Sequence, residues 1–165
     1  MTATRILAAL GLGAVLAGCA GGAGGPVITN EYRNTTYAPR VLTYPAAEGG
    51  LYTEVVGRPF GADPDALARK VTGVMERAHF GNKVPLTTDP AQRDKGSYRL
   101  VALFDPDRRL DYGDVCRGER TQAGSDSATG TTTMLLTFCR GSKVISSLKA
   151  RQGGLSGLDD PAFEA

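Results

Sequence analysis

The stretch Thr131–Ala150, TTTMLLTFCRGSKVISSLKA, carries the strongest indication of the fold. Its first half, Thr131 to Arg140, is rich in the β-branched and aromatic residues that favour strands. The tetrapeptide RGSK at residues 140–143 has the composition of a tight turn, and Val144 to Ala150 again favours a strand. The sequence therefore predicts an antiparallel hairpin near the end of the chain.

Two further strands are predicted upstream of the hairpin. Leu51 to Val56, LYTEVV, is bounded by Gly57 and Pro59, which end strands. In Ser97 to Phe104, SYRLVALF, every second residue is apolar or aromatic, so these side chains share one face of a strand. An Asp-Pro-Asp turn sequence follows. The hairpin and these two segments together predict about four strands.

Between these two strands, residues 62–80, ADPDALARKVTGVMERAHF, predict the main helix. Asp63 is suited to the N-cap, and Pro64 to the first helical position. The apolar residues recur at helical spacing and form one stripe: Leu67, Val71, Val74, Met75 and Ala78. This stripe predicts a helix that packs on the sheet.

The order strand, helix, strand, strand, strand predicts a single small α+β domain, with one main helix on a mostly antiparallel sheet of about four strands. Val27 to Pro45 shows no sustained period and is expected to be an extended, irregular arm lying on the domain. The glycine-rich tail is expected to end in a short docked segment at Phe163.

The chain begins MTATRILAALGLGAVLAGC, with a charged residue, Arg5, before an apolar run from Ile6 to Leu16. This order is typical of a secretory signal peptide, and the run is well short of the ~20 residues that cross a bilayer as a helix. The sequence LAGC at residues 16–19 resembles the lipobox of bacterial lipoproteins. The resemblance implies cleavage before Cys19 and lipid attachment to Cys19. The alternative is a soluble secreted protein in which Cys19 is removed or incidental.

The lipobox sets the expected domain boundaries: a signal peptide at residues 1–18, a lipidated cysteine and flexible tether at 19–30, and one domain at 31–165. Because the anchor carries several acyl chains, membrane attachment is expected to be stable. Ala20 is not the aspartate associated with inner-membrane retention in that family. The expected location is therefore the outer membrane with the domain in the periplasm; the inner membrane and the cell surface are the alternatives.

Once Cys19 carries lipid, only Cys116 and Cys139 remain, and paired cysteines usually form a disulfide in an oxidising compartment. Such a bridge would stabilise the domain by ~3 kcal/mol. A redox-active pair is disfavoured, because the two residues form no C-x-x-C motif. The order of FDP, CRGE, FCRGSK and DDPAF, between Tyr52 and Phe163, resembles small uncharacterised alphaproteobacterial lipoproteins, and this resemblance implies that the bridge is shared.

The charge balance argues against nucleic acid as a partner. The chain has 19 Lys and Arg residues and 17 Asp and Glu residues, a net charge of +2 that falls to +1 when Arg5 is removed with the signal. Such a chain offers no broad basic surface. No cofactor is expected.

Four acidic residues form the best candidate metal site: Asp105, Asp107, Asp111 and Asp114 in DPDRRLDYGD. Alternating carboxylates on a loop can bind Ca²⁺. However, the glycine and glutamate positions of a calcium loop are not matched, and two arginines offset two of the charges. Turn and capping roles are therefore the favoured interpretation.

Other candidate sites are weaker. His79 is the single histidine of the chain and is expected to complement the end of the helix. Ser146 and Lys149 match S-x-x-K, but this motif needs a helix and they fall on a predicted strand. Four tyrosines, Tyr32, Tyr37, Tyr44 and Tyr52, are expected to pack on the sheet rather than to line a binding surface.

These observations predict a non-enzymatic envelope lipoprotein that is bound to the membrane by its lipid and that binds or supports another envelope protein. The alternative is a small-ligand or metal-ion binding module that uses the Asp105 to Asp114 loop.

Overall fold

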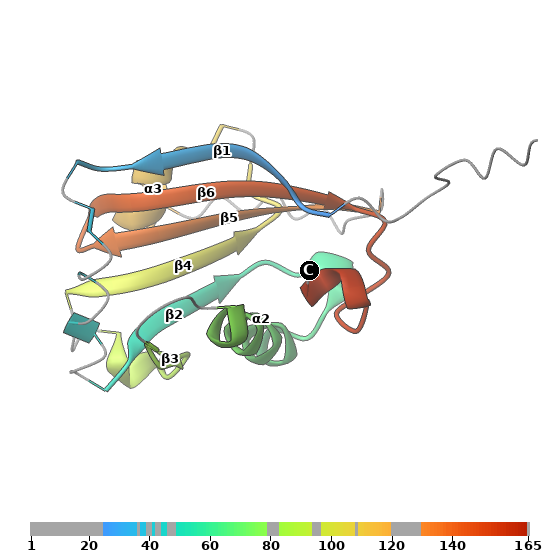
Figure 1. The fold of residues 1–165 in the computed structure, drawn as a ribbon, viewed down its shortest axis with the longest axis horizontal. Helices are drawn as coiled ribbons and strands as arrows, with labels where there is room; N and C mark the ends of the chain where they lie inside the picture. Colours follow the sequence, from blue (N-terminus) through green and yellow to red (C-terminus); the bar gives the residue numbers. More distant parts are fainter. Residues whose placement is uncertain are drawn as a thin grey trace, which may run out of the picture.

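The computed structural model describes residues 25–35, 37–38, 41, 44–45, 49–78, 83–93, 97–107, 109–119 and 130–164. They form one six-stranded sheet with two helices (Figure 1). The strands are β1 (Val27–Arg33), β2 (Leu51–Val56), β3 (Leu86–Thr87), β4 (Tyr98–Phe104), β5 (Thr131–Arg140) and β6 (Lys143–Gly153). The helices are α2 (Pro64–Ala78) and α3 (Tyr112–Arg117), with short 3-10 turns η2 (Pro59–Gly61), η3 (Pro90–Gln92) and η4 (Pro161–Glu164).

The sheet is mixed, and its strand order is β1-β6-β5-β4-β2-β3. The pairs β1–β6, β6–β5 and β5–β4 are antiparallel, whereas β4–β2 and β2–β3 are parallel. The predicted α+β class and single main helix are confirmed, but the expected sheet of about four mostly antiparallel strands is partly wrong. Both parallel pairs arise because α2 follows β2 and carries the chain back, so that β3 and β4, which come after α2, run in the same direction as β2.

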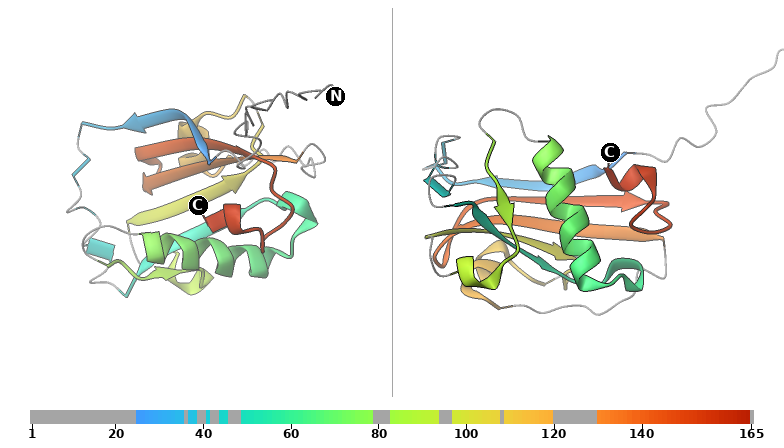
Figure 2. Two further views of the ribbon diagram at one scale, coloured as in Figure 1. Left: turned by 45° about the vertical axis from the view of Figure 1, so that its right-hand side comes forward. Right: turned by 90° about the horizontal axis from the view of Figure 1, so that it is seen from below.

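Helix α2 begins where the sequence predicted. The Asp63 Oδ1 atom accepts a hydrogen bond from the Ala66 backbone N–H at 2.9 Å, so Asp63 caps the helix. Leu67 and Val71 from the apolar stripe are buried, whereas Ala78 at the end of the stripe is exposed. Figure 2 shows α2 lying across one face of the sheet, with the C-terminal segment beside it.

The predicted hairpin is confirmed as β5 and β6. Arg140 pairs with Lys143 across a two-residue turn, in which Gly141 has a φ of 56° that favours glycine. Strand β6 continues beyond the predicted end at Ala150, as far as Gly153. This extra length matters because β1 pairs with the outer side of β6, and Val27 pairs with Arg151, which lies beyond Ala150.

The expected irregular arm is wrong for Val27–Arg33, which forms strand β1. Residues 27–30 of the expected tether therefore lie in the sheet. β1 pairs along β6 with an irregularity between Ile28 and Asn30, and every residue of the strand is exposed. An exposed strand with a bulge has no regular alternation of apolar residues, so its pattern did not predict a strand.

Strand β4 is covered on both faces, and its alternating residues contribute to two parts of the core. Ala102 and Phe104 pack with Leu67 and Val71 of α2. On the opposite face, the core cluster brings strands β4 and β5 together with α3; its buried members are Val101, Leu103, Val115, Cys116, Leu135 and Cys139.

The C-terminal segment closes the α2 side of the core, as expected for Phe163. The Phe163 ring stacks on Phe104 at a centroid distance of 6.3 Å. Glu164 accepts hydrogen bonds from Lys70 at 2.5 Å and from Arg77 at 3.0 Å. The hydrogen bond and charge of Lys70, with the charge of Arg77, lower the pKa of Glu164. None of the described helices is long and apolar enough to span a membrane.

Candidate functional site

The predicted disulfide joins Cys116 of α3 to Cys139 of β5, and this prediction is confirmed. The two Cα atoms are 5.6 Å apart, and both residues are buried among the apolar side chains between α3 and the sheet. The bridge fixes a helix of only six residues, too short to be stable alone, on the middle of the sheet.

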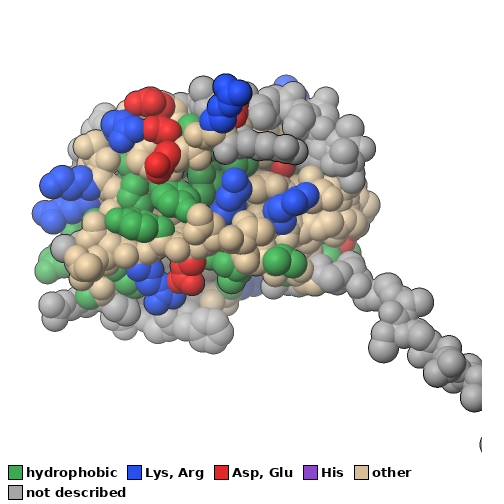
Figure 3. Space-filling view, turned by 90° about the horizontal axis from the view of Figure 1, so that it is seen from above, with side chains coloured by type: hydrophobic (Ala, Val, Ile, Leu, Met, Phe, Trp, Pro, Cys, Tyr) green, Lys and Arg blue, Asp and Glu red, His purple; other side chains and the backbone are tan. Residues whose placement is uncertain are grey.

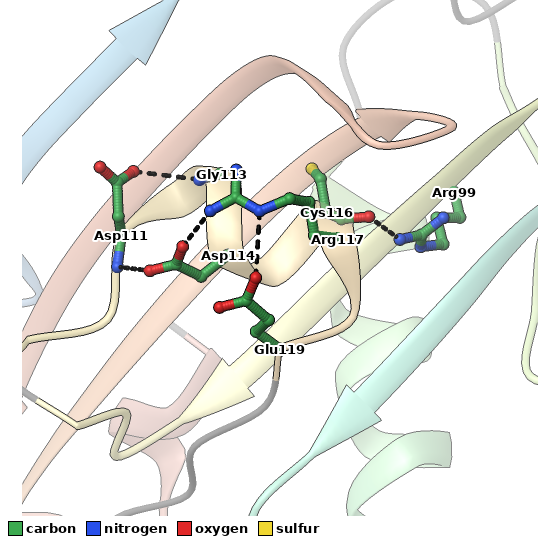
Figure 4. Close-up of polar contacts among 7 residues, drawn as sticks. All are labelled: Arg99, Asp111, Gly113, Asp114, Cys116, Arg117 and Glu119. Atoms are coloured by element: carbon green, nitrogen blue, oxygen red, sulfur yellow. Dashed lines mark hydrogen bonds and ion pairs between the residues drawn. The ribbon is translucent and has the colours of Figure 1, made fainter.

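The acidic segment before this bridge forms the N-terminus of α3 (Figure 4). Asp111 is the N-cap, and its Oδ1 atom accepts a hydrogen bond from the Gly113 N–H at 3.0 Å. The Asp114 Oδ2 atom accepts a hydrogen bond from the Asp111 N–H at 2.9 Å, which completes a capping box. Arg117 forms ion pairs with Asp114 and Glu119. The hydrogen bond to Glu119 is the main cause of a raised pKa at Arg117.

The other two acidic residues follow β4, and they bond to different parts of the chain. The Asp105 Oδ1 atom accepts a hydrogen bond from the Thr133 N–H at 2.8 Å. The Asp107 Oδ1 atom accepts one from the Arg109 N–H, also at 2.8 Å. Asp107, Asp111 and Asp114 thus have the turn and capping roles favoured from the sequence, whereas Asp105 bonds across to β5. Within the described residues, no three Asp, Glu, Cys or His side chains gather as a metal site.

Arg99 of β4 links the C-terminal end of α3 to the sheet. Its Nη2 atom donates a hydrogen bond to the Cys116 carbonyl oxygen (Figure 4), and its Nη1 atom donates one to the Gly141 carbonyl at 3.2 Å. One guanidinium therefore links β4, the end of α3 and the β5–β6 turn. The charged side chains around α3 therefore have structural partners: Asp114, Arg117 and Glu119 pair with one another, and Arg99 bonds to backbone carbonyls.

Two of the remaining predicted sites, Cys19 and His79, lie outside the described residues. Ser146 and Lys149 lie on β6, as the strand prediction required. Because they are three positions apart on a strand, their side chains point to opposite faces of the sheet. The S-x-x-K geometry, in which both side chains share one helical face, is not formed.

The four tyrosines have different environments. Tyr52 is buried and Tyr37 packs against the core cluster around Phe138, as expected. Tyr44 is 61% exposed, which differs from the expectation of packing. Tyr32 of β1 is 38% exposed, and its ring stacks on Tyr112 of α3 at a centroid distance of 5.9 Å.

The free edge of β1 is the surface that most resembles a docking site. β1 ends the sheet, so its outer side has no neighbouring strand among the described residues. Val27 is 62% exposed and Ile28 is 60% exposed, whereas soluble proteins usually protect a long edge strand. Figure 3 looks onto this side of the molecule and shows hydrophobic side chains gathered beside a group of acidic ones, with Lys and Arg side chains around them.

The face of the sheet beside β1 is hollowed. A groove of about 340 Å³ runs along the α2 side of strands β1, β6 and β5, where α2 does not reach. Ile28 and Leu148 supply apolar walls, and Glu31 and Arg33 form an ion pair at its rim. A smaller cavity of about 130 Å³ lies between α2 and the C-terminal segment, lined mainly by apolar residues such as Val74 and Phe163.

The sequence did not indicate this surface. The residues that form it are all exposed, and its apolar residues, Val27, Ile28 and Tyr32, do not alternate with polar ones, so the periodicity by which strands are recognised is absent. Its one visible signal is the run Val27-Ile28 directly after Pro26, two β-branched residues that favour a strand start.

No family model matches the chain, and no curated protein matches its sequence. A solved structure, the PelC L103M dodecamer from Paraburkholderia phytofirmans, is similar at a TM-score of 0.39 and 15% sequence identity, over 83% of this chain and 89% of that chain. This likeness is too low to support an argument about function.

Proposed function

We propose that this chain is a non-enzymatic, lipid-anchored envelope protein whose domain binds a protein partner through the free edge of β1. The observation that carries this proposal is a seven-residue edge strand in which every residue is exposed and two adjacent side chains, Val27 and Ile28, are apolar. A free edge offers backbone N–H and C=O groups to an extended segment, and neighbouring side-chain positions give specificity.

The anchor part of the proposal rests on the sequence. The charged start, the apolar run and LAGC at residues 16–19 resemble a lipoprotein signal. The bridge between Cys116 and Cys139 agrees with an oxidising compartment such as the periplasm. We place the anchor in the outer membrane because Ala20 follows the cysteine.

The proposed site and the proposed anchor are close in sequence. Only seven residues separate Cys19 from Val27, the first residue of β1. Fully extended, these residues span at most about 25 Å, so the β1 edge stays near the bilayer surface. A partner held on the same membrane would meet this edge at a high effective concentration.

The experiment on the anchor compares wild type with Cys19→Ser in membrane fractionation and intact mass measurement. We expect wild type in the membrane fraction with the added mass of acyl chains, and the variant in the soluble fraction. A wild-type chain without added mass would contradict the anchor and leave the docking surface to be judged separately.

The experiment on the docking surface places a photocrosslinking side chain at Ile28 of the full chain in intact cells, with the exposed Asp65 on α2 as the control position. We expect an adduct of one defined mass from position 28 and none from position 65. No adduct from position 28 would contradict the proposal. A calcium-dependent rise in Tm that Asp107→Ala removes would instead favour the ion-binding hypothesis.

A further inference from the structure

We propose that the partner segment on the β1 edge runs antiparallel to β1 and carries an acidic, a basic and a large apolar residue at alternate positions, in that order. This inference rests on the proposed function, because it names the chemistry of the partner of the same surface. The acidic residue would lie opposite Arg33, the basic residue opposite Glu31 and the apolar residue beside Ile28.

The backbone of β1 shows which residues can bond to an incoming strand. The Asn34 N–H donates to the Ile145 carbonyl of β6 at 2.9 Å. Backbone groups of successive residues point to opposite sides of a strand, so those of Tyr32 also point toward β6. The N–H and C=O groups of Glu31 and Arg33 therefore point outward, where an extended segment can bond to them.

The side chains of these two residues lie on the face of the sheet that α2 partly covers. Glu31 pairs with Leu148 of β6. Leu148 pairs in turn with Leu136 of β5, and Leu136 pairs with Ala102 of β4. Residues directly opposite one another share a face, and Ala102 packs against α2. Arg33, two positions after Glu31, lies on the same face.

The groove of about 340 Å³ lies on this face, directly beside the edge. Ile28, Glu31 and Arg33 line it from β1, and Leu148 and Phe138 line it from β6 and β5. Alternate side chains of an incoming strand would point to this face. A large apolar side chain among them would pack on Ile28 and reach into the groove, as in other sites that bind a peptide as an added strand.

The charges of β1 set the other two positions. Opposite charges in directly facing positions stabilise a strand pair, and like charges destabilise it. Glu31 and Arg33 already form an exposed ion pair with each other. A basic residue opposite Glu31 and an acidic residue opposite Arg33 would extend this pair into a group of four alternating charges.

The direction of the segment sets the order of the three residues. Antiparallel pairing is slightly more stable per residue than parallel pairing. An antiparallel segment passes Arg33 first, then Glu31, then Ile28. At the irregularity between Ile28 and Asn30, β1 has one residue more than β6, so the residue two places after the basic one would lie beside Ile28.

Two peptides that differ only in the order of their charges test the motif on the purified full chain in lipid nanodiscs. TETKTFT carries the proposed order, and TKTETFT exchanges the two charges. We expect TETKTFT to bind about tenfold more tightly in fluorescence anisotropy, because the exchange turns both cross-strand pairs into like-charge pairs. The double variant Glu31→Arg/Arg33→Glu should reverse this preference.

Equal binding of the two peptides, or the same preference in the double variant, would overturn the inference. Tighter binding of TKTETFT to wild type would indicate a parallel segment and would also overturn it, as would no binding of either peptide at about 1 mM. The photocrosslink at Ile28 in cells separates the two levels of the proposal. An adduct without a charge preference would retain the docking surface and refute the motif, whereas no adduct would refute both.

A matched pair of substitutions tests the groove. Val27 is 62% exposed and Ile28 is 60% exposed, but their side chains point to opposite faces because they are adjacent on a strand. Ile28→Ala should weaken binding of TETKTFT about fivefold, and Val27→Ala should leave it unchanged. The peptide TETKTAT, which lacks the large apolar side chain, should bind both variants and wild type alike. An equal loss of TETKTFT binding in the two variants, or no loss in either, would refute the groove as the place of the apolar residue.

Discussion

Reduction of the Cys116–Cys139 bridge should destabilise the domain by about 3 kcal/mol at 25 °C. The bridge closes a loop with a sequence separation of 23, and its removal returns the corresponding chain entropy to the unfolded state. Reduction leaves both sulfur atoms in place, so the packing changes little. The loss in free energy of unfolding therefore reports the entropy of loop closure alone. Cys116→Ala/Cys139→Ala should lose roughly 1 kcal/mol more, because both side chains are buried in the core around α3.

The assay is urea unfolding followed by circular dichroism, with and without reductant, on the domain purified from the periplasm. For a domain of this size, a loss of 3 kcal/mol corresponds to a fall in Tm of about 10 °C. The double alanine variant should not respond to reductant, which controls for effects outside the bridge. A loss below about 1 kcal/mol in wild type, with full reduction shown by thiol titration, would refute the reasoning. We also expect hydrogen exchange of α3 to rise on reduction, since so short a helix depends on its tertiary contacts.

Gly57→Ala should destabilise the domain by roughly 2 to 3 kcal/mol in the same urea assay, because φ is +115° and the new Cβ would lie 2.8 Å from Phe104 atoms; an unchanged midpoint would contradict the close approach of the end of β2 to β4. Gly73→Ala, in the middle of α2 with only the end of a flexible side chain nearby, should stabilise the domain by up to ~1 kcal/mol, and a lower midpoint would be the opposing result. Glu164 has a pKa lowered mainly by its hydrogen bond to Lys70, so its contribution is present above pH 4.5 and is lost as pH falls below that value. Glu164→Gln should therefore reduce the difference in Tm between pH 7 and pH 3, and an identical difference in both proteins would argue against this contact in solution.

The sequence predicted the elements whose residues carry their own signals. Leu51–Val56 and the β5–β6 hairpin have runs of β-branched and aromatic residues bounded by turns, and both were predicted with close boundaries. Helix α2 has a cap, a proline at its first position and an apolar stripe, which are local features. The bridge could also be predicted, because only two cysteines remain after the lipobox.

The sequence did not predict elements that depend on distant partners. β1 is a strand because β6 aligns it, and its partners, such as Arg151 for Val27, lie more than a hundred positions away. The six-residue helix α3 is too short to show a helical period, although Asp111 and Asp114 have the spacing of a capping box. The parallel pairing of β2 with β4 follows from the helix between them rather than from the residues of either strand. The candidate interaction surface was missed because it consists of β1.

The pairing of β1 with β6 also sets an order of events during biosynthesis. Chains leave the ribosome from the N-terminus, so Val27–Arg33 is the first strand to appear and β6 is the last. Until β6 follows, β1 has no neighbour on either side and the sheet lacks one of its edges. β1 therefore cannot pair until nearly the whole chain has been synthesised. During that interval β1 is unpaired, and a holding chaperone could bind it.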